Sequence, residues 1–302
     1  MLYNVPDKKR LIIIDGNALA HRAYHALPSL RTKGGELINA VYGFLSVFLK
    51  IIRELQPDYI VATFDTPQPT FRHKEFKEYK IKRPAVPEDL SQQFPKIKEI
   101  LENFGIPIFE KEGFEADDLI GTIAKLAPKK QIMPEIETII LSGDLDVLQL
   151  IDKNTKVYTF KKGLKDTVLY DAKEVMKRYG IVPHQLIDFK SLRGDPSDNI
   201  PGVTGIGEKT AIQLIKDFGS LENLYQNIEE KTDHSEKIKP ATKEKLIKYK
   251  DQAFFSKTLS EIKRDVPVDF NLEKCDFKEY NKERMTQVFK NLEFYSLIER
   301  LP

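Results

Sequence analysis

The sequence predicts an α/β fold with a central, mostly parallel sheet and flanking helices, followed by a smaller α-helical domain. Runs rich in β-branched residues and bounded by turn formers indicate strands at residues 11–14, 59–64 and 138–141. Helical patterns separate these runs, and strands that alternate with helices are typical of a parallel sheet. From about residue 171 the strand signal fades, and short helical segments separated by Gly and Pro replace it.

Helical patterns lie between the predicted strands, two of them with apolar residues at spacings of three and four. These helices are expected at residues 40–55, 94–104 and 116–126, and a further short strand at 156–160 extends the sheet. We therefore expect an α/β domain over residues 1–172 and a helical domain over residues 173–302. The last segment, 281–301, is expected to dock an apolar face on the body of the protein.

Composition excludes several classes of protein. The longest apolar stretch is about 13 residues, shorter than the roughly 20 that a membrane-spanning helix requires. The single cysteine, Cys275, can form neither a disulfide within the chain nor a cysteine-based zinc site. No secretory signal follows the N-terminal basic cluster. We therefore expect a cytoplasmic protein without membrane association.

The distribution of charge is more informative than its total. The 48 basic and 46 acidic residues leave a net charge of +2, which does not by itself indicate a polyanionic ligand. Residues 71–83, however, contain six Lys or Arg and two Glu, whereas acidic residues concentrate at the ends of predicted strands and helices. The sequence therefore predicts a basic patch beside an acidic site.

Acidic residues follow three of the predicted strands. Asp15 ends the first, Asp65 the second, and Asp144 and Asp146 come directly after the third. Ligands of an open parallel sheet bind outside the carboxyl ends of its strands, so these acids should converge at one edge.

Two further acidic groups join this set. In GFEADDL, Glu115 and Asp118 share one face of a helix start, with Asp117 beside them. The loop RGDPSDN adds Asp195 and Asp198 at the entry to the helical domain. Each acid could alternatively be a helix cap or a first-turn residue.

The cap explanation is weak for the whole set, because two unit charges about 4 Å apart repel by roughly 4 kcal/mol at an effective dielectric of about 20. Cations must therefore lie among them. Oxygen ligands without nearby His or Cys favour Mg²⁺ or Mn²⁺ over zinc. Two such ions can activate water and stabilise the attacking and leaving oxygens at phosphorus, which predicts phosphodiester hydrolysis.

The segment IPGVTGIGEKTA, residues 200–211, predicts a helix-hairpin-helix motif whose second helix begins near residue 208. Glycines let backbone N–H groups approach a phosphate, and the helix N-terminus adds a positive dipole. Such contacts bind the DNA backbone without reading bases. The residues expected to bind DNA here are Gly202, Gly205, Gly207, Lys209 and Thr210. A Gly-rich connector is the alternative.

A basic and aromatic helix is predicted directly after Asp65. In FRHKEFKEYKIKR, Arg72, Phe76, Tyr79 and Arg83 have spacings of four, three and four, which place them on one helical face. This face suits phosphate contact and stacking on unpaired bases, with Arg72 and Phe76 as expected DNA contacts. A solvated amphipathic helix is the alternative. Little core was expected beneath this segment, so we predict that it is mobile.

Five ordered motifs resemble those of the 5′ nuclease and flap endonuclease superfamily, and most closely the 5′→3′ exonuclease domain of bacterial DNA polymerase I. The motifs are LIIIDGNALAHRAYHAL, FDTPQPTFRHKEFKEYKIKRP, GFEADDLIGTIA, LSGDLDVLQL and RGDPSDNIPGVTGIGEKTA. The resemblance covers nearly the whole chain. It implies a PIN-like or resolvase-like domain, a helical arch over about residues 66–100, and a metal-dependent nuclease acting on 5′ flaps and nicked or branched DNA in primer removal and repair.

The resemblance also implies roles for individual residues. It places Asp15, Asp65, Glu115, Asp117 and Asp118 in one metal group, and Asp144, Asp146, Asp195 and Asp198 in a second. It further implies that Arg22, Tyr79, Lys80 and Arg83 engage the 5′ strand and the scissile phosphate. The hairpin would hold the downstream duplex, around K⁺ in some members. Leu145 replaces a common Lys or Arg, but that position is not a ligand in the family pattern.

Partners and rival functions complete the expectations. We expect a monomer that acts on flapped DNA or on an RNA primer–DNA hybrid, with a DNA polymerase in cis or in trans. No polymerase sequence follows Pro302, so a standalone nuclease and an excised domain are both open. The rivals are a non-catalytic DNA-binding module and a PIN-type ribonuclease, the latter without the hairpin.

Overall fold

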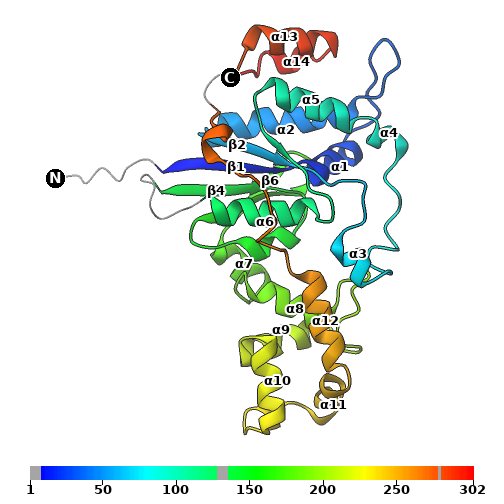
Figure 1. The fold of residues 1–302 in the computed structure, drawn as a ribbon, viewed down its shortest axis with the longest axis vertical. Coiled ribbons are helices and arrows are strands. Elements are labelled where there is room, and N and C mark those ends of the chain that lie inside the picture. Colours follow the sequence, from blue (N-terminus) through cyan, green and yellow to red (C-terminus); the bar gives the residue numbers. More distant parts are fainter. Residues whose placement is uncertain (1–7, 128–134, 278–279) are drawn as a thin grey trace, which may run out of the picture.

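The computed structural model describes residues 8–127, 135–277 and 280–302 and contains a six-stranded sheet of order β3-β2-β1-β4-β5-β6 (Figure 1). The strands are β1 (Lys9–Asp15), β2 (Tyr59–Thr63), β3 (Ile108–Phe109), β4 (Ile136–Leu141), β5 (Thr155–Lys162) and β6 (Asp166–Tyr170). All pairings are parallel except that of β5 with β6. The predicted parallel sheet is confirmed, and the short β3 and the antiparallel edge strand β6 are additions to it.

Alternate residues of the central strands point to opposite faces of the sheet, as strand geometry requires. Ile12 and Ile14 join one apolar cluster, whereas Leu11 and Ile13 join the other. Helices α1 (Gly16–Ala26), α2 (Asn39–Leu55) and α5 (Phe94–Asn103) pack on the first face, and α6 (Ala116–Leu126) packs on the second. Because both faces are covered, consecutive apolar residues fill the middle of β1 at residues 11–14 and the end of β4 at residues 139–141.

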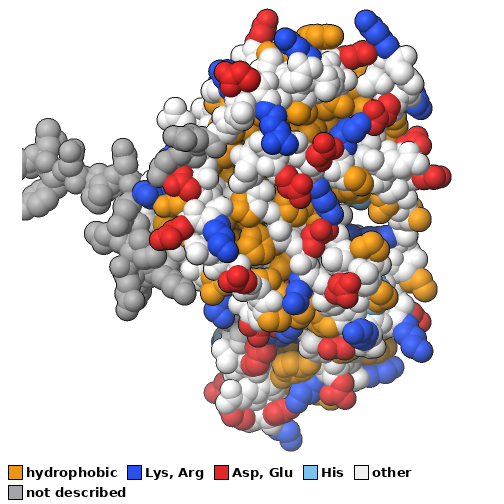
Figure 2. Space-filling view, turned by 45° about the horizontal axis from the view of Figure 1, so that its top comes forward, with side chains coloured by type: hydrophobic (Ala, Val, Ile, Leu, Met, Phe, Trp, Pro, Cys, Tyr) orange, Lys and Arg blue, Asp and Glu red, His pale blue; other side chains and the backbone are white. Residues whose placement is uncertain are grey.

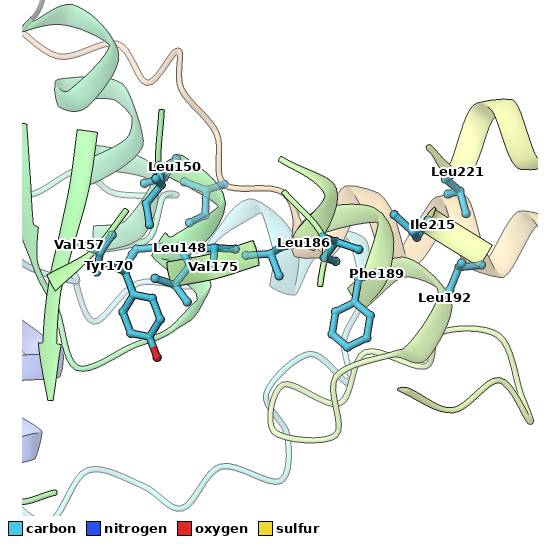
Figure 3. Close-up of a cluster of buried hydrophobic side chains, with 14 of the residues drawn as sticks. Leu148, Leu150, Val157, Tyr170, Val175, Leu186, Phe189, Leu192, Ile215 and Leu221 are labelled. Atoms are coloured by element: carbon cyan, nitrogen blue, oxygen red, sulfur yellow. The ribbon is translucent and has the colours of Figure 1, made fainter. Parts of the chain in front are cut away.

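The helical region lies at one end of the molecule (Figure 1). Its helices are α7 (Ala172–Tyr179), α8 (Gln185–Arg193), α9 (Glu208–Phe218), α10 (Leu221–Glu230), α11 (Pro240–Lys248) and α12 (Lys250–Ser260). Its core is continuous with the core beneath the sheet, since one cluster runs from Val157 through Leu186 and Phe189 to Ile215 (Figure 3). Apolar packing thus fixes the helical region against the carboxyl ends of the strands.

The C-terminal segment crosses back to the far side of the sheet. It forms α13 (Lys282–Asn291) and α14 (Tyr295–Ile298). Met285 and Phe289 are fully buried in the cluster that contains α2 and α5. The expected docking of an apolar face is confirmed. The segment forms two short helices, whereas the sequence indicated one continuous helical pattern.

Surface charge is mixed. On the face shown in Figure 2, positive and negative side chains are interspersed, in keeping with the net charge of +2. Within the described ranges, no helix combines the length and the apolar character needed to span a bilayer.

Candidate active site

The acidic site lies where the sheet changes direction. The chain runs from β1 outward to β2 and β3, and then returns to β4 on the other side of β1. Crevices at such switch points are the usual ligand sites of open α/β sheets. Asp15 ends β1 and caps α1, and its carboxylate accepts a 2.6 Å hydrogen bond from the hydroxyl of Ser142, just beyond β4. The ends of β1 and β4 therefore meet at this edge of the sheet.

The acid that follows β2 belongs to the same edge. Asp65 accepts a 2.7 Å hydrogen bond from the backbone N–H of Ala116, at the start of α6. Burial raises the pKa of Asp65, and the charge of Glu115 raises it further. Asp65 is therefore joined to the acidic helix start predicted from the sequence.

Three carboxylates at this edge repel one another. Burial raises the pKa of Asp15 to about 7, with the charges of Asp65 and Asp144 adding to the effect. Burial and the charge of Asp146 raise the pKa of Asp144 to about 6. Burial raises the pKa of Asp117 well above its usual range, and the negative charges of Asp144 and Asp15 raise it further. In the part of the chain that the structure describes, no Lys or Arg forms an ion pair with Asp15, Asp117 or Asp144.

A second acidic group is held by a lysine that the sequence analysis missed. The ammonium of Lys190, on α8, contacts Asp146 and lies 2.7 Å from Asp195. Burial lowers the pKa of Lys190, but the negative charges of Asp146 and Asp195 have the larger effect. The net result is a raised pKa for Lys190. Burial would likewise raise the pKa of Asp195, yet Lys190 lowers it to about 2. A lysine five residues before Asp195 was the available signal.

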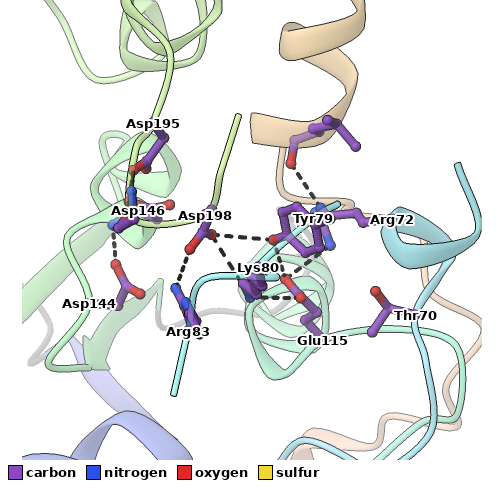
Figure 4. Close-up of polar contacts among 12 residues, drawn as sticks. Thr70, Arg72, Tyr79, Lys80, Arg83, Glu115, Asp144, Asp146, Asp195 and Asp198 are labelled. Atoms are coloured by element: carbon purple, nitrogen blue, oxygen red, sulfur yellow. Dashed lines mark hydrogen bonds and ion pairs between the residues drawn. The ribbon is translucent and has the colours of Figure 1, made fainter. Parts of the chain in front are cut away.

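Two arch cations lie between the acidic groups (Figure 4). Lys80 donates to Glu115 at 2.7 Å, with Asp198 at 3.9 Å, and Arg83 donates to Asp198 at 2.5 Å. The hydroxyl of Tyr79 donates to Glu115 at 3.1 Å. The structure therefore brings Tyr79, Lys80 and Arg83 together with both groups of acids. Together with Asp117, Asp144 and Asp146 they line one cleft.

The predicted continuous helix through this segment is wrong. Helix α3 (Phe71–Glu75) ends before Phe76, and a turn follows in which Lys80 has a positive φ of 55°. Such a backbone is costly for a non-Gly residue and is often found at functional sites. The helix ends because aromatic residues turn toward the helical domain instead: Phe76 packs on Phe255, and Tyr79 is buried against Leu259.

This packing also removes the basis on which mobility was predicted. Tyr79 is 4% exposed and Arg72 is 2% exposed, so the segment has a core to bury against. Phe76 makes an edge-to-face contact with Phe255, with ring centroids 5.6 Å apart, and is therefore engaged within the protein. Phe76 is nevertheless partly exposed, so its stacking on unpaired bases stays a prediction.

Arg72 and Asp118 have a different role from the one expected. The guanidinium of Arg72 makes two 2.8 Å hydrogen bonds to Asp118, which is fully buried. Arg72 is thus inaccessible to DNA. Both oxygens of Asp118 are used within the protein, so it is not free to bind an ion. The expected roles of Arg72 as a DNA contact and of Asp118 as a metal ligand are therefore corrected. A buried charge needs a partner, and here each residue neutralises the other.

Arg22 is also placed differently. Its Nε donates to the carbonyl of Gly163 at 3.1 Å, and its guanidinium lies over the ring of Phe160. The structure therefore directs Arg22 toward the turn between β5 and β6, and no contact joins it to the carboxylates described above.

The hairpin has the geometry that its glycines predict. Gly202 and Gly205 have φ of 60° and 81°, in the left-handed region, and α9 begins at Glu208 with Gly207 as its N-cap. A Cβ at Gly202 would lie 2.2 Å from the backbone N of Gly194, so no other residue fits there. Lys209 and Thr210 lie in the first turn of α9, and Lys209 is exposed.

The acidic residues do not form a preformed metal site. Among the described residues, no group of three or more His, Cys, Asp or Glu is already arranged to hold an ion. Glu115, Asp146, Asp195 and Asp198 are turned toward Lys80, Arg83 and Lys190 instead. The chemistry of the donors nevertheless fits a hard divalent cation, because the acids are oxygen ligands and three of them lack a counter-charge.

A larger cavity than the acidic cleft lies elsewhere. It has a volume of about 550 Å³ and lies between the end of α2 and the C-terminus, lined in part by Arg53, Glu299 and Pro302. It contains none of the acids described above, so the reactive site is assigned by its chemistry and not by its size.

The fold and the acidic cleft define the class of this protein: a resolvase-like α/β domain joined to a helical hairpin module. Two family models match the chain, the 5′-3′ exonuclease N-terminal resolvase-like domain over residues 10–180 and the 5′-3′ exonuclease C-terminal SAM fold over residues 181–283. The chain therefore belongs to the 5′-3′ exonuclease family, as the sequence motifs predicted.

Curated relatives support this membership. The chain is 43% identical to DNA polymerase I of Bacillus subtilis (strain 168) over 295 residues, which cover 98% of this chain and 32% of that protein. It is also 43% identical to DNA polymerase I of Caldicellulosiruptor bescii, with 97% of this chain and 33% of that protein covered. The chain thus spans about a third of the length of these relatives.

Solved structures share the fold. T5 5′-exonuclease with bound divalent zinc ions matches with a TM-score of 0.66 and 22% identity, over 84% of this chain and 90% of that one. The catalytic core of Rad2 in complex with DNA substrate matches with a TM-score of 0.61 and 18% identity, over 97% and 93%. These matches confirm the predicted fold class.

Proposed function

We propose that this chain is a metal-dependent, structure-specific 5′ nuclease that hydrolyses phosphodiester bonds at 5′ flaps and at nicked or branched duplex DNA, in primer removal and repair. One observation carries the proposal. Asp15 is buried, and Asp117 and Asp144 lie partly buried beside it. The three carboxylates repel one another and, among the described residues, form no ion pair, while Lys80 and Arg83 lie in the same cleft as Asp117 and Asp144. Such a group is stable and useful only where cations and a phosphate bind.

The residues that would hold divalent ions follow from the two acidic groups. Asp15, Asp65, Glu115 and Asp117 would form the first, and Asp144, Asp146, Asp195 and Asp198 the second. Mg²⁺ or Mn²⁺ suits these oxygen ligands, and such ions lower the pKa of a bound water and offset charge at the phosphate. Asp118 is left out because Arg72 occupies both of its oxygens.

The arch supplies positive charge to the reacting phosphate. Lys80 and Arg83 bind Glu115 and Asp198 in the absence of substrate, and both can turn to a phosphate oxygen when these acids bind metal instead. Preorganised cations at a developing negative charge are among the strongest contributors to catalysis. Tyr79 holds Glu115 through its hydroxyl and is thus a positioning residue.

The hairpin would hold the downstream duplex through Gly205, Gly207, Lys209 and Thr210, with the buried Gly202 shaping the turn that presents them. Exposed backbone at the start of α9 suits a phosphate. A bound K⁺ would meet competition, because the carbonyls of Gly202 and Gly205 already accept hydrogen bonds from Gln252 and Lys245. We therefore expect K⁺ to be dispensable for duplex binding.

The rival functions fit less well. A non-catalytic DNA-binding module has no use for buried, mutually repelling acids, and a PIN-type ribonuclease lacks the hairpin module. An RNA primer on a DNA template could be a second substrate. A DNA polymerase, as in the relatives, would be the partner in cis or in trans, and a cytoplasmic monomer remains our expectation.

The function is tested by incubating the protein with a 5′-flap DNA, with Mg²⁺ or with EDTA, and resolving the products on a denaturing gel. We expect a cut near the junction only with Mg²⁺. Competition by an unlabelled RNA flap measures the preference for DNA. Binding without any Mg²⁺-dependent product would support the non-catalytic module.

A pair of glycine substitutions tests the hairpin. Gly202→Ala should weaken binding to nicked duplex by at least about 10-fold, because its Cβ would collide with the backbone of Gly194 and displace the hairpin. Each phosphate contact that the displaced hairpin loses costs about 1 kcal/mol or more. Gly34→Ala is the control, because Gly34 is exposed, lies outside the hairpin, and its added Cβ would meet only the Thr32 hydroxyl, at 3.6 Å. Fluorescence anisotropy in EDTA measures both. Equal affinities for the two variants would contradict the assigned role of the hairpin.

A further inference from the structure

Arg72 is the most fully bonded side chain near the site, and the proposed reaction does not use it. Its guanidinium makes five hydrogen bonds, which use every N–H donor that an arginine has. Two go to Asp118, one to Glu115, and two to the carbonyls of Leu259 and Glu261. Arg72 thus joins three segments that are far apart in sequence.

Asp118 is equally saturated. Its two oxygens accept four hydrogen bonds, two from Arg72 and one each from the backbone N–H groups of Glu115 and Lys263. The first backbone bond fixes the start of α6, where Glu115 lies. The second fixes the segment by which the chain returns from the helical domain to the sheet.

The contacts of Arg72 with Leu259 and Glu261 fall at the C-terminal end of α12. Unpaired carbonyls and the negative end of a helix dipole favour a cation there. Asp118 lies in the first turn of α6, where a negative charge is favoured. The Arg72–Asp118 pair therefore ties the end of one helix to the beginning of another.

Helix α12 also holds the hairpin. The side chain of Gln252 donates to the carbonyl of Gly202, and the hydroxyl of Ser256 accepts from the N–H of Gly202 at 3.1 Å. One helix thus contacts the proposed duplex-binding hairpin along its length and the acidic rim at its end. In Figure 1, α12 runs from the helical region up to α3.

We propose that the Arg72–Asp118 pair is a positioning clasp that sets the distance between the duplex grip and the reacting phosphate, and so determines where the DNA is cut. This inference rests on the proposed function and adds a specificity-determining pair to it. A displacement of about 3 Å corresponds to about one nucleotide along a DNA strand. A loosened clasp should therefore spread the cuts over neighbouring phosphates.

The test uses two variants chosen to fold. Arg72→Lys keeps the charge but cannot reach all five partners, and the double variant Arg72→Gln with Asp118→Asn removes both charges together. We expect both to bind flap DNA within about twofold of the wild type, to cut at least about 10-fold more slowly in single turnover, and to cut at several adjacent positions. Lys74→Gln, an exposed arch lysine on the same helix, is the control and should cut at the wild-type position.

Cut positions are read at nucleotide resolution, and hydroxyl-radical footprints of the bound flap are compared in the absence of Mg²⁺. Wild-type cut positions in both clasp variants would overturn the proposal, even where their rates or stabilities fall. If the wild type binds but does not cut, the proposed function fails. In that case the footprints of the variants and of the wild type are compared to test the clasp. The same footprint in all three proteins would overturn the proposal.

Discussion

Asp144→Asn should lower the rate of Mg²⁺-dependent flap cleavage by at least about 10³-fold, since metal ions supply several kcal/mol of transition-state stabilisation. Asp144 lies between Asp117 and Asp146, so its charge is needed to draw cations into both acidic groups. The hairpin is untouched, and flap binding should therefore persist. Single-turnover cleavage and anisotropy measure the two effects separately.

The same substitution should raise the melting temperature of the metal-free protein. Burial and Asp146 raise the folded-state pKa of Asp144 to about 6, so its charge destabilises the fold at neutral pH. The sign follows from linkage: a carboxyl with a raised folded pKa loses stability as the pH rises from the unfolded value of about 4 through the folded value. The gain from Asp144→Asn should thus be largest above pH 6 and disappear below pH 4.

Added Mg²⁺ should stabilise the wild type more than Asp144→Asn, because binding to the native state adds stability by mass action. Asp233→Asn, at an exposed acid of the helical domain, is the control and should behave like the wild type. Retained cleavage in Asp144→Asn, or an equal Mg²⁺ shift in all three proteins, would contradict the assigned role.

Sequence reasoning succeeded where one element determines the position of a residue. The strands that end at Asp15 and before Asp65 and Asp144 are apolar and β-branched, and a parallel sheet must bring their carboxyl ends together. Likewise, the glycines of residues 200–211 predicted a hairpin before a helix near residue 208, and in the structure α9 begins at Glu208 after left-handed backbone at Gly202 and Gly205.

It failed where a contact joins distant segments. The spacing of Arg72, Phe76 and Tyr79 fits a helix, but Phe255 and Leu259 lie about 180 residues away and bury that face instead. Tertiary packing overrides local periodicity in such cases. Asp118 has the same local pattern as a metal ligand, and only the partner that reaches it across 46 residues distinguishes a clasp from a ligand.

Lys190 shows a related limit. Its spacing from Asp195 was a local signal, but its second contact arises only because α8 carries it to Asp146, 44 residues away in the sequence. The boundary between the domains was drawn from the fading of strand signals, yet the apolar core crosses it without interruption. The two acidic groups are therefore aligned by packing that no single motif contains.

Lys80→Met should reduce kcat by about 10²- to 10³-fold, the loss typical of removing one preorganised donor from a developing negative charge. The ammonium of Lys80 lies 2.7 Å from Glu115 and 3.9 Å from Asp198, between the two acidic groups where a scissile phosphate would lie. Its left-handed backbone, with φ of 55°, holds the side chain in that direction. Methionine keeps an unbranched side chain, one atom shorter, and removes the ammonium group.

The effect should fall on kcat and not on KM, because a cation already paired with Glu115 contributes to ground-state binding much less than to the transition state. Lys82→Met is the matched control, because Lys82 is exposed on the same turn. Its loss should weaken the salt dependence of KM and leave kcat nearly unchanged. Measurement of both constants for flap cleavage separates the two lysines. A similar fall in kcat for both variants would show that the arch acts through its overall charge, and the specific role of Lys80 would then be wrong.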